Sequence, residues 1–170
     1  MAKKSKNSKN HKPESSHQRL LATNPNAKRN YFIEDIIEAG VQLQGTEVKS
    51  LRDQSPTIDD AYVEIKNTSG SIQAYLINAA INPYRHGTAW NHDLKRKRKL
   101  LLHRNEIDRL FGAIHQKGFT IIPTKIYFKK GVVKVQIGLG KPKKIHDKRD
   151  DLKRKTADRE MAAALKRSQR

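Results

Sequence analysis

Histidine and carboxylate side chains are the first candidates for chemistry, because they hold metal ions and transfer protons. The 170-residue sequence contains seven histidines. His103 and His115 lie twelve positions apart, more than three helical turns, so they cannot share one metal ion, and no His-x-x-x-His pair occurs. Acidic neighbours such as Asp59 and Asp60 are usually solvated, whereas acid–base catalysis needs carboxylates held across a cleft. We therefore predict no metal, no cofactor and no catalytic site.

A run of basic residues offers a different chemistry, the binding of phosphates. The segment Leu94–Lys99, LKRKRK, places five consecutive Lys or Arg residues before the clearest predicted helix. A helix dipole disfavours cations at the N-terminus, so a bound anion would account for their placement. Nearby Tyr84, His86 and Trp90 can stack on unpaired bases, as in proteins that read single-stranded RNA. A solvated charge run is the alternative, and we favour RNA contact.

The C-terminal segment IHDKRDDLKRKTADRE, Ile145–Glu160, is the second basic feature. Asp150 precedes Arg154 by four residues, which is the favourable order for an ion pair along a helix. The segment lacks an apolar stripe, and an isolated helix of this size is marginal in water. We therefore predict that residues 141–170 are disordered alone and become helical when RNA phosphates surround them.

Positive charge is concentrated at the two ends of the chain. The 36 Lys and Arg residues outnumber the 17 Asp and Glu residues, which gives a formal net charge of +19. Residues 1–30 carry a net +7, residues 141–170 another +7, and the 110 residues between them only +5. Basic segments of this kind usually bind nucleic acid, because each cation that meets a phosphate releases condensed counterions. Charge that only prevents aggregation is the alternative.

Composition also predicts the compartment. The sequence has no cysteine, which excludes disulfides and thiolate metal sites and fits a reducing environment. The N-terminal residues lack the apolar region of a secretory signal. No segment approaches the roughly 18–20 consecutive apolar residues of a membrane span. We therefore expect a soluble, cytoplasmic protein with no membrane association.

The centre of the chain must supply the scaffold that positions these groups. Residues 1–28 contain few large aliphatic side chains, so we expect a disordered basic arm there. The alternating segment YFIEDIIEAGVQLQ predicts a strand, with a bulge or bend at Gly40. GTEVKSLRDQ predicts a short helix that Thr46 caps, with Lys49 and Arg52 on its polar side.

Two hairpins and a long helix follow. AYVEIKN and SIQAYLINAAI alternate in polarity and flank a glycine-containing turn, which predicts the first hairpin. NPYRHGTAWNHDLKRKRK is a polar loop of about 18 residues, and loops this long are usually functional or mobile. LLLHRNEIDRLFGAIHQKG has helical apolar spacing and ends at Gly118. FTIIPTKIYF and VVKVQIGLG predict the second hairpin.

These elements predict a mainly β fold, a small closed antiparallel barrel of the oligonucleotide-binding (OB) type. It would have five or six strands, about three helices and flexible basic segments at both ends. A flat antiparallel sheet with helices on one face is the alternative, but a small flat sheet leaves two unpaired edges that closure removes. We therefore expect a disordered arm at 1–28, an RNA-binding barrel at 29–140 and a basic tail at 141–170.

Several long blocks resemble one known family, the SsrA-binding proteins, also called small protein B or SmpB. The resemblance runs from about Lys12 to the C-terminus. It rests on NYFIEDIIEAGVQLQGTEVKSLR, DAYVEI, RKLLLHRNEIDRL, IYFKKGVVKVQIGLGKPKKIHDKR and the basic tail. It implies an OB-type barrel that binds the tRNA-like domain of transfer-messenger RNA (tmRNA, SsrA). Such an adaptor brings this RNA to stalled ribosomes for trans-translation, which rescues the ribosome and tags the incomplete peptide.

The resemblance also implies a division of labour between barrel and tail. The barrel would pack on the elbow of the tRNA-like fold and replace its missing anticodon arm. The tail would enter the empty mRNA channel and fold as a helix beside the 16S rRNA decoding centre. Elongation factor Tu would bind the same RNA. A general ribosomal or RNA-chaperone protein is the alternative that charge alone also permits.

Two groups of residues are the predicted sites. By resemblance, four positions match tmRNA-binding positions of the family: Asn24, Glu38, Leu101 and His103. At His103, other members of the family can carry Asn. Six basic residues are predicted to add RNA contacts: Lys49, Arg52, Arg96, Lys97, Arg98 and Lys99. In the tail, seven residues are predicted to bind the ribosome: His146, Asp147, Lys148, Arg149, Lys153, Arg154 and Lys155. By resemblance, His146 matches a position that stacks on decoding-centre rRNA.

Overall fold

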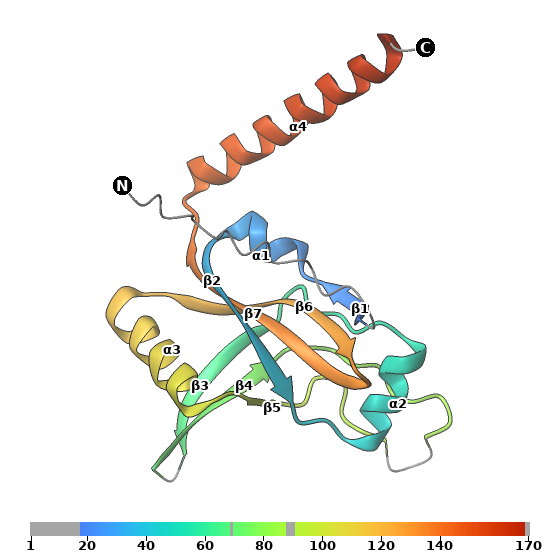
Figure 1. Ribbon diagram of the computed structural model, residues 1–170, viewed down its shortest axis with the longest axis vertical. Helices are drawn as coiled ribbons and strands as arrows, with labels where there is room; N and C mark the ends of the chain where they lie inside the picture. The colour runs from blue at the N-terminus through green and yellow to red at the C-terminus, as the bar shows by residue number, and fades with distance from the viewer. Residues whose placement is uncertain (1–17, 69, 88–90, 169–170) are drawn as a thin grey trace, which may run out of the picture.

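Six antiparallel strands close into a ring, and a seventh strand pairs with one edge of the ring; helices lie at its ends (Figure 1). The computed structural model describes residues 18–168, apart from residues 69 and 88–90. The strands are β1 (Gln18–Thr23), β2 (Tyr31–Val41), β3 (Tyr62–Thr68), β4 (Ser71–Ile77), β5 (Arg98–Leu101), β6 (Thr120–Lys129) and β7 (Val132–Pro142). The helices are α1 (Pro25–Asn30), α2 (Gly45–Asp53), α3 (Arg104–Lys117) and α4 (Ile145–Ser168).

Closure of the ring depends on β6. The strands follow the order β3–β4–β5–β2–β7–β6, and Val63 of β3 pairs with Ile121 of β6 to complete the circle. The rest of that edge of β6 is covered by β1, where Gln18 pairs with Lys129. Closure joins the two outer strands that a flat sheet would leave open, which is the physical reason that favoured a barrel. The predicted OB-like architecture is confirmed.

Alternating side chains fill the interior of the barrel. On β7, Val133, Val135 and Ile137 are almost fully buried, while the residues between them face outward. Side chains on successive strand residues point to opposite faces, so a strand with one buried face alternates in this way. The hairpins β3–β4 and β6–β7 both lie where the alternating segments predicted them.

The long helix begins later than its apolar pattern predicted. Leu100 lies in β5, where it pairs with Val41 on one side and with Ala74 on the other. A short apolar run fits a buried strand as well as a buried helix. Here it forms a strand, because it fills the position between β2 and β4 in the ring. α3 therefore starts at Arg104 and ends at Lys117, and the residue that caps it, Gly118, has a left-handed φ of 62° that a glycine adopts without strain.

Part of the segment predicted as an N-terminal arm is folded. Residues 18–28, expected to be disordered, form β1 and the first part of α1, and residues 1–17 lie outside the described part of the chain. Leu21 and Ala27 are buried in the barrel, which gives this segment the apolar contacts that its composition did not suggest. The two additional elements bring the described total to seven strands and four helices.

Two local predictions on β2 and α2 need correction. Gly40 pairs regularly with Lys134 and Leu101, and the register of β2 shifts between Ile33 and Asp35 instead. The N-cap residue of α2 is Gln44, whose backbone N–H donates to the Glu47 carboxylate at 2.6 Å. A glutamine was not recognised as a cap because short polar residues are the usual N-caps.

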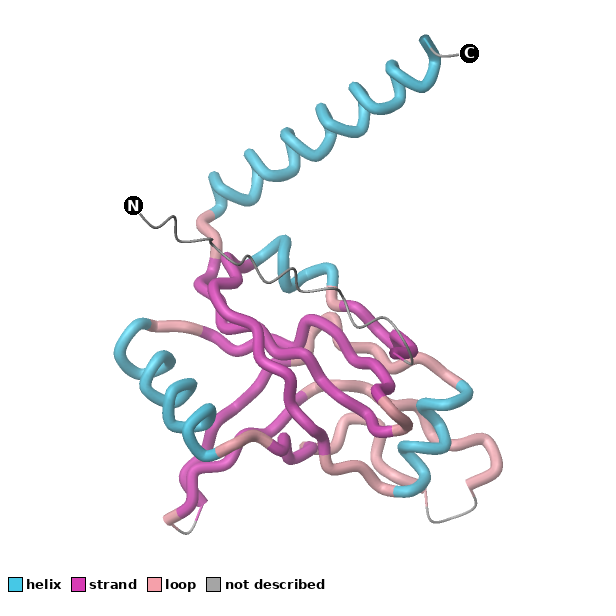
Figure 2. Tube along the Cα trace, in the orientation of Figure 1, coloured by secondary structure: helices cyan, strands magenta, loops and turns pink. Residues whose placement is uncertain are grey.

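The C-terminal helix leaves the barrel directly after β7. α4 begins at Ile145, and Figures 1 and 2 show it extending away from the barrel rather than lying along it. Every side chain of its second half that the structure describes is exposed, which agrees with the missing apolar stripe. None of the helices within the described residues is long and apolar enough to cross a lipid bilayer.

Candidate nucleic-acid interface

The outer face of β2 carries a row of exposed side chains. Phe32, Ile36 and Glu38 alternate with inward-facing residues along this strand. The row continues at Leu101 of β5, which is 56 % exposed. Leu101 lies opposite Gly40, and a Cβ atom at that glycine would come within 3.1 Å of the Leu101 Cβ. The glycine therefore provides the space in which this large apolar side chain lies on the surface.

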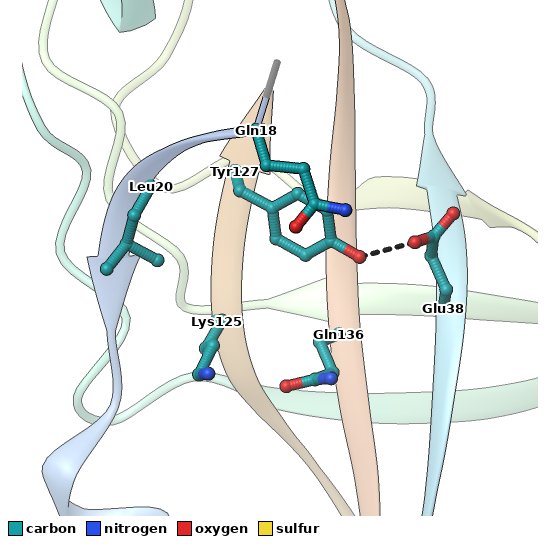
Figure 3. Close-up of a pocket in the computed structure, with 6 residues that line it drawn as sticks. All are labelled: Gln18, Leu20, Glu38, Lys125, Tyr127 and Gln136. Carbon is teal, nitrogen blue, oxygen red and sulfur yellow. Dashed lines mark hydrogen bonds between the residues drawn. The ribbon is translucent and has the colours of Figure 1, made fainter. Parts of the chain in front are cut away.

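Glu38 is held by its neighbours on the β6–β7 hairpin. The Tyr127 hydroxyl donates to one carboxylate oxygen at 2.5 Å, as Figure 3 shows, and Lys129 Nζ donates to the two oxygens at 3.0 and 3.2 Å. The Tyr127 hydrogen bond lowers the pKa of Glu38; partial burial opposes this shift, and Lys129 adds to it. Burial and the Glu38 carboxylate both raise the pKa of Tyr127. Glu38 is therefore a charged carboxylate at neutral pH.

A polar cleft of about 410 Å³ opens beside Glu38 (Figure 3). Its walls come from β1, β2, β6 and β7, which carry six lining residues: Gln18, Leu20, Glu38, Lys125, Tyr127 and Gln136. Five of these were not among the predicted site residues. Alternation alone places Lys125 and Gln136 on outward faces, but only the register of the β6–β7 hairpin shows that they lie opposite each other.

Asn24 and His103, the other two family-matched residues, have different environments. Asn24 is 3 % exposed, and its amide donates to the carbonyls of Ile58 and Pro123 while its oxygen accepts from Ala27 N. This residue joins β1, α1 and β6 from inside the protein, so its side chain is not available to a surface partner. His103 is exposed at the N-terminus of α3.

The basic run divides into an inner and an outer set. The Arg98 side chain is fully buried, and its Nε donates to Glu47 at 2.8 Å. Arg96 donates to the same carboxylate through Nε at 2.8 Å and Nη2 at 2.5 Å. The predicted RNA contact of Arg98 is therefore wrong, because its guanidinium is buried and donates to the Glu47 carboxylate. The dipole explanation also fails, since the basic run ends inside β5 and residues 100–103 separate it from α3.

Glu47 is the centre of this buried ion cluster. Its side chain is 0 % exposed. Burial raises the pKa of Glu47, but the hydrogen bonds from Arg96, the Gln44 backbone and Arg98 outweigh it and hold the pKa below its ordinary value. Burial lowers the pKa of Arg98, and the Glu47 carboxylate opposes that shift. The cluster fixes α2 against β5, so it determines where the outward-facing lysines of the run lie.

The outer basic residues remain on the surface. Lys97 is exposed and Lys99 is half-buried on β5. Lys49 is exposed on α2, with its Nζ 5.7 Å from the centre of the Tyr84 ring. The exposed Arg52 lies near β1, because its carbonyl accepts from the Arg19 guanidinium at 3.0 Å.

The loop before the basic run has internal supports that the sequence did not reveal. The Asn91 side chain accepts from Tyr84 N at 3.1 Å and donates to Tyr84 O at 2.9 Å. His92 is buried, with its ring nitrogens 3.0 Å from Thr46 Oγ1 and from the Ile81 carbonyl. Trp90, predicted to stack on a base, lies outside the described residues. The sequence did not reveal the hydrogen-bond partners of Asn91 and His92, because these contacts join residues up to 46 positions apart.

The base of the tail helix is attached to the barrel. The Lys143 Nζ donates to the carbonyl of Lys28 at the end of α1 and lies 4.7 Å from the centre of the Phe32 ring. The Asp147 carboxylate accepts from Lys144 N at 3.1 Å. Three of the predicted tail residues are exposed on α4: Arg149, Lys153 and Arg154. Three others have side chains outside the described part of the structure: His146, Lys148 and Lys155.

The described side chains are not arranged to bind a metal ion. Within residues 18–168, gaps excepted, no group of three or more His, Asp or Glu side chains is placed to hold a metal ion. The two arginines, rather than a metal, neutralise the buried Glu47 carboxylate.

Known proteins resemble this chain over most of its length. The profile of the SmpB protein family matches residues 21–167. SsrA-binding proteins from Geobacter sulfurreducens and Oceanobacillus iheyensis are 48 % and 49 % identical to it. These alignments cover 88 % and 87 % of this chain, and 95 % and 94 % of the two relatives.

A solved structure shows the same fold. A chain from the structure named "tmRNA-SmpB: a journey to the center of the bacterial ribosome" has a TM-score of 0.58 and 44 % sequence identity. The match covers 73 % of this chain and 85 % of that one. Identity at this level over a whole barrel and its tail requires common descent. The chain therefore belongs to the SmpB protein family.

Proposed function

We propose that this protein is an RNA-binding adaptor for the tRNA-like domain of transfer-messenger RNA, delivering it to stalled ribosomes for trans-translation. The observation that carries the proposal is near-half identity, across 88 % of the chain, to a relative named SsrA-binding protein. The exposed row on β2 and β5, with Glu38 and Leu101, supplies a surface for the RNA. The function is binding rather than catalysis.

The tail has a separate role in this proposal. α4 enters the empty mRNA channel and lies beside the 16S rRNA decoding centre, where its cations meet rRNA phosphates. Two features support this role: the helix extends away from the barrel, and Arg149, Lys153 and Arg154 are exposed. Elongation factor Tu joins the same RNA at a surface that this protein does not cover.

Filter binding over several salt concentrations tests the adaptor function. The full-length protein is titrated with the tRNA-like domain and with an unrelated hairpin of equal length. An adaptor prefers the tRNA-like domain at every salt concentration, because shape and base contacts persist when phosphate contacts weaken. Equal affinity for the two RNAs throughout would instead support a general ribosomal or RNA-chaperone protein, the alternative consistent with the +19 charge.

A further inference from the structure

The cleft beside Glu38 contains two hydrogen-bond donors that make no contact with an acceptor among the residues that the structure describes. We propose that Lys125 and Gln136 bind an acceptor group of the RNA in this cleft, and that Glu38 is a positioning residue that holds the cleft wall. The inference rests on the proposed function and deepens it, because it assigns new RNA-contacting residues and changes the role of Glu38.

Glu38 is poorly suited to touch RNA itself. Its two oxygens already accept from the Tyr127 hydroxyl and the Lys129 ammonium, at 2.5 to 3.2 Å. A carboxylate in this ionised state repels phosphates and has little capacity left for base donors. Its effect is to fix the Tyr127 side chain and Lys129 on β6, and so to shape one wall of the cleft.

Gln136 presents a donor rather than an acceptor. The Thr124 hydroxyl donates to Gln136 Oε1 at 3.0 Å and, at 3.1 Å, to the carbonyl of the same residue. The amide oxygen is thereby engaged, and in this orientation the Nε2 group is the one left to donate. Its Nε2 group has no acceptor among the described residues, although this glutamine lines the open cleft.

Lys125 supplies a second donor next to the first. It is exposed and pairs directly with Gln136 in the register of β6 and β7. Directly opposed residues of an antiparallel pair have Cβ atoms about 4.5–5.5 Å apart, so both side chains can reach one group. In the described part of the chain, Lys125 makes no ion pair, whereas Lys129 and Lys134 both face Glu38.

Two adjacent donors require a ligand rich in acceptors. RNA offers adjacent acceptors in its phosphate oxygens and in the O6 and N7 atoms of guanine. The cleft volume of about 410 Å³ accommodates a nucleotide, and Leu20, which is 58 % exposed, gives one wall an apolar surface. An unpaired nucleotide of the RNA is therefore the ligand, held through a phosphate or through a guanine edge.

The test measures affinity of the full-length protein for the tRNA-like domain. Lys125→Met and Gln136→Leu each weaken binding about tenfold, the loss of a two-donor contact that needs both donors. The double variant is scarcely weaker than the worse single variant, because the two donors share one acceptor group. Lys125→Arg restores most of the affinity. The control is Lys66→Met, which removes one exposed charge on β3, where Lys66 pairs with Glu64.

RNA containing 7-deazaguanine separates the two acceptor sources. If guanine N7 is the acceptor, this RNA binds wild type and Lys125→Met equally. If phosphate is the acceptor, the difference between the proteins persists, and Lys125→Met lowers the slope of log affinity against log salt by about one. Both results support the proposal. Lys125 and Gln136 variants that bind like Lys66→Met would overturn it.

The role of Glu38 has its own test. As a positioning residue it acts through Tyr127, so Glu38→Gln and Tyr127→Phe both weaken binding and their effects are not additive. Fully additive losses, or a Tyr127→Phe variant that binds like wild type, would show that Glu38 does not act through Tyr127. Thermal unfolding of each variant confirms that the barrel is intact.

The experiments distinguish failure of the proposed function from failure of the cleft assignment. If wild-type protein does not prefer the tRNA-like domain to an unrelated hairpin, the adaptor function fails. If that preference holds but the Lys125 and Gln136 variants match Lys66→Met, only the cleft assignment fails.

Discussion

Glu47 shows how a single side chain can reverse the interpretation of a motif. Five consecutive basic residues suggested one phosphate-binding surface, yet two of them point inward to a carboxylate 49 and 51 positions away. A strand alternates its side chains, so Arg98 faces the core while Lys97 and Lys99 face outward. The buried arginine is accommodated because Glu47 and backbone carbonyls satisfy its donors.

Substitution of Glu47 by Gln is expected to destabilise the barrel strongly. It leaves the buried Arg98 guanidinium without a counter-charge, a change that typically costs about 3–5 kcal/mol. Urea unfolding followed by circular dichroism measures the loss. The matched control is Glu34→Gln, because Glu34 is exposed and its nearest cation, Lys141, lies 3.7 Å away. Equal unfolding midpoints for the two variants would contradict the role of Glu47.

The same carboxylate makes stability depend on pH. The pKa of Glu47 in the folded state lies below its ordinary value of 4.5. Its contribution to the free energy of unfolding is therefore complete above about pH 4.5 and is lost as the pH falls through the lowered folded-state value. We expect the stability difference between wild type and Glu47→Gln to shrink over that window. Urea titrations from pH 7 downward check this, and a constant difference would contradict it.

At the scale of elements, the tail is the least supported helix of the chain. α4 has 24 residues, and its side chains are exposed wherever the second half is described. Its helicity must come from local propensity, ion pairs and the capping contact of Asp147. Such a helix is marginal in water, and nearby phosphates would stabilise its cations.

A peptide of residues 141–170 is expected to be mostly unfolded alone and to gain helicity with RNA. Circular dichroism with increasing concentrations of RNA measures the change. A peptide in which Lys153, Arg154 and Lys155 are replaced by Gln is the control, and its gain should be much smaller because it makes fewer phosphate contacts. A fully helical peptide without RNA would refute coupled folding of the tail.

Lys143 is expected to set the direction of α4. Its contacts with the Lys28 carbonyl and the Phe32 ring attach the short link between β7 and α4 to the barrel. Lys143→Met removes the charged contacts, so the helix should sample a wider range of orientations. The chain has no cysteine, so Asn67→Cys and Ala163→Cys allow two specific spin labels. Electron-spin distance measurements should show a broader distribution for Lys143→Met than for Lys141→Met, and identical distributions would exclude this anchoring role.

At the scale of the whole molecule, the exposed surface of the barrel and the basic ends of the chain have different roles. The barrel carries the exposed row of β2 and the cleft, while 14 of the 19 excess positive charges lie in residues 1–30 and 141–170. Most of the specific surface therefore lies between the two segments that carry the surplus charge. In the proposed function, the barrel selects the RNA and the tail engages the ribosome.

This division predicts two separable defects. Glu38→Ala should weaken binding of the tRNA-like domain, because it releases Tyr127 and Lys129. His146→Ala should leave that affinity nearly unchanged and impair rescue of stalled ribosomes. Filter binding and a reconstituted tagging reaction measure the two steps. If both variants fail at the same step, barrel and tail do not act separately.

The sequence alone determined the class of the fold, the two hairpins and the uneven distribution of charge. Those features depend on neighbouring residues: strand alternation has a period of two, and net charge is a sum over segments. Leu100 and Leu101 were assigned to the wrong element because a short apolar run fits a strand or a helix equally well. Here the run completes the barrel between β2 and β4.

Only the tertiary structure decided which polar side chains are on the surface. Arg98 and Asn24 were predicted to bind RNA but are buried, while Lys125 and Gln136 were not predicted and line the cleft. The physical reason is that a side chain's partner depends on strand register and chain closure. These bring together residues such as Glu38 and Tyr127, 89 positions apart, and no local pattern encodes that distance.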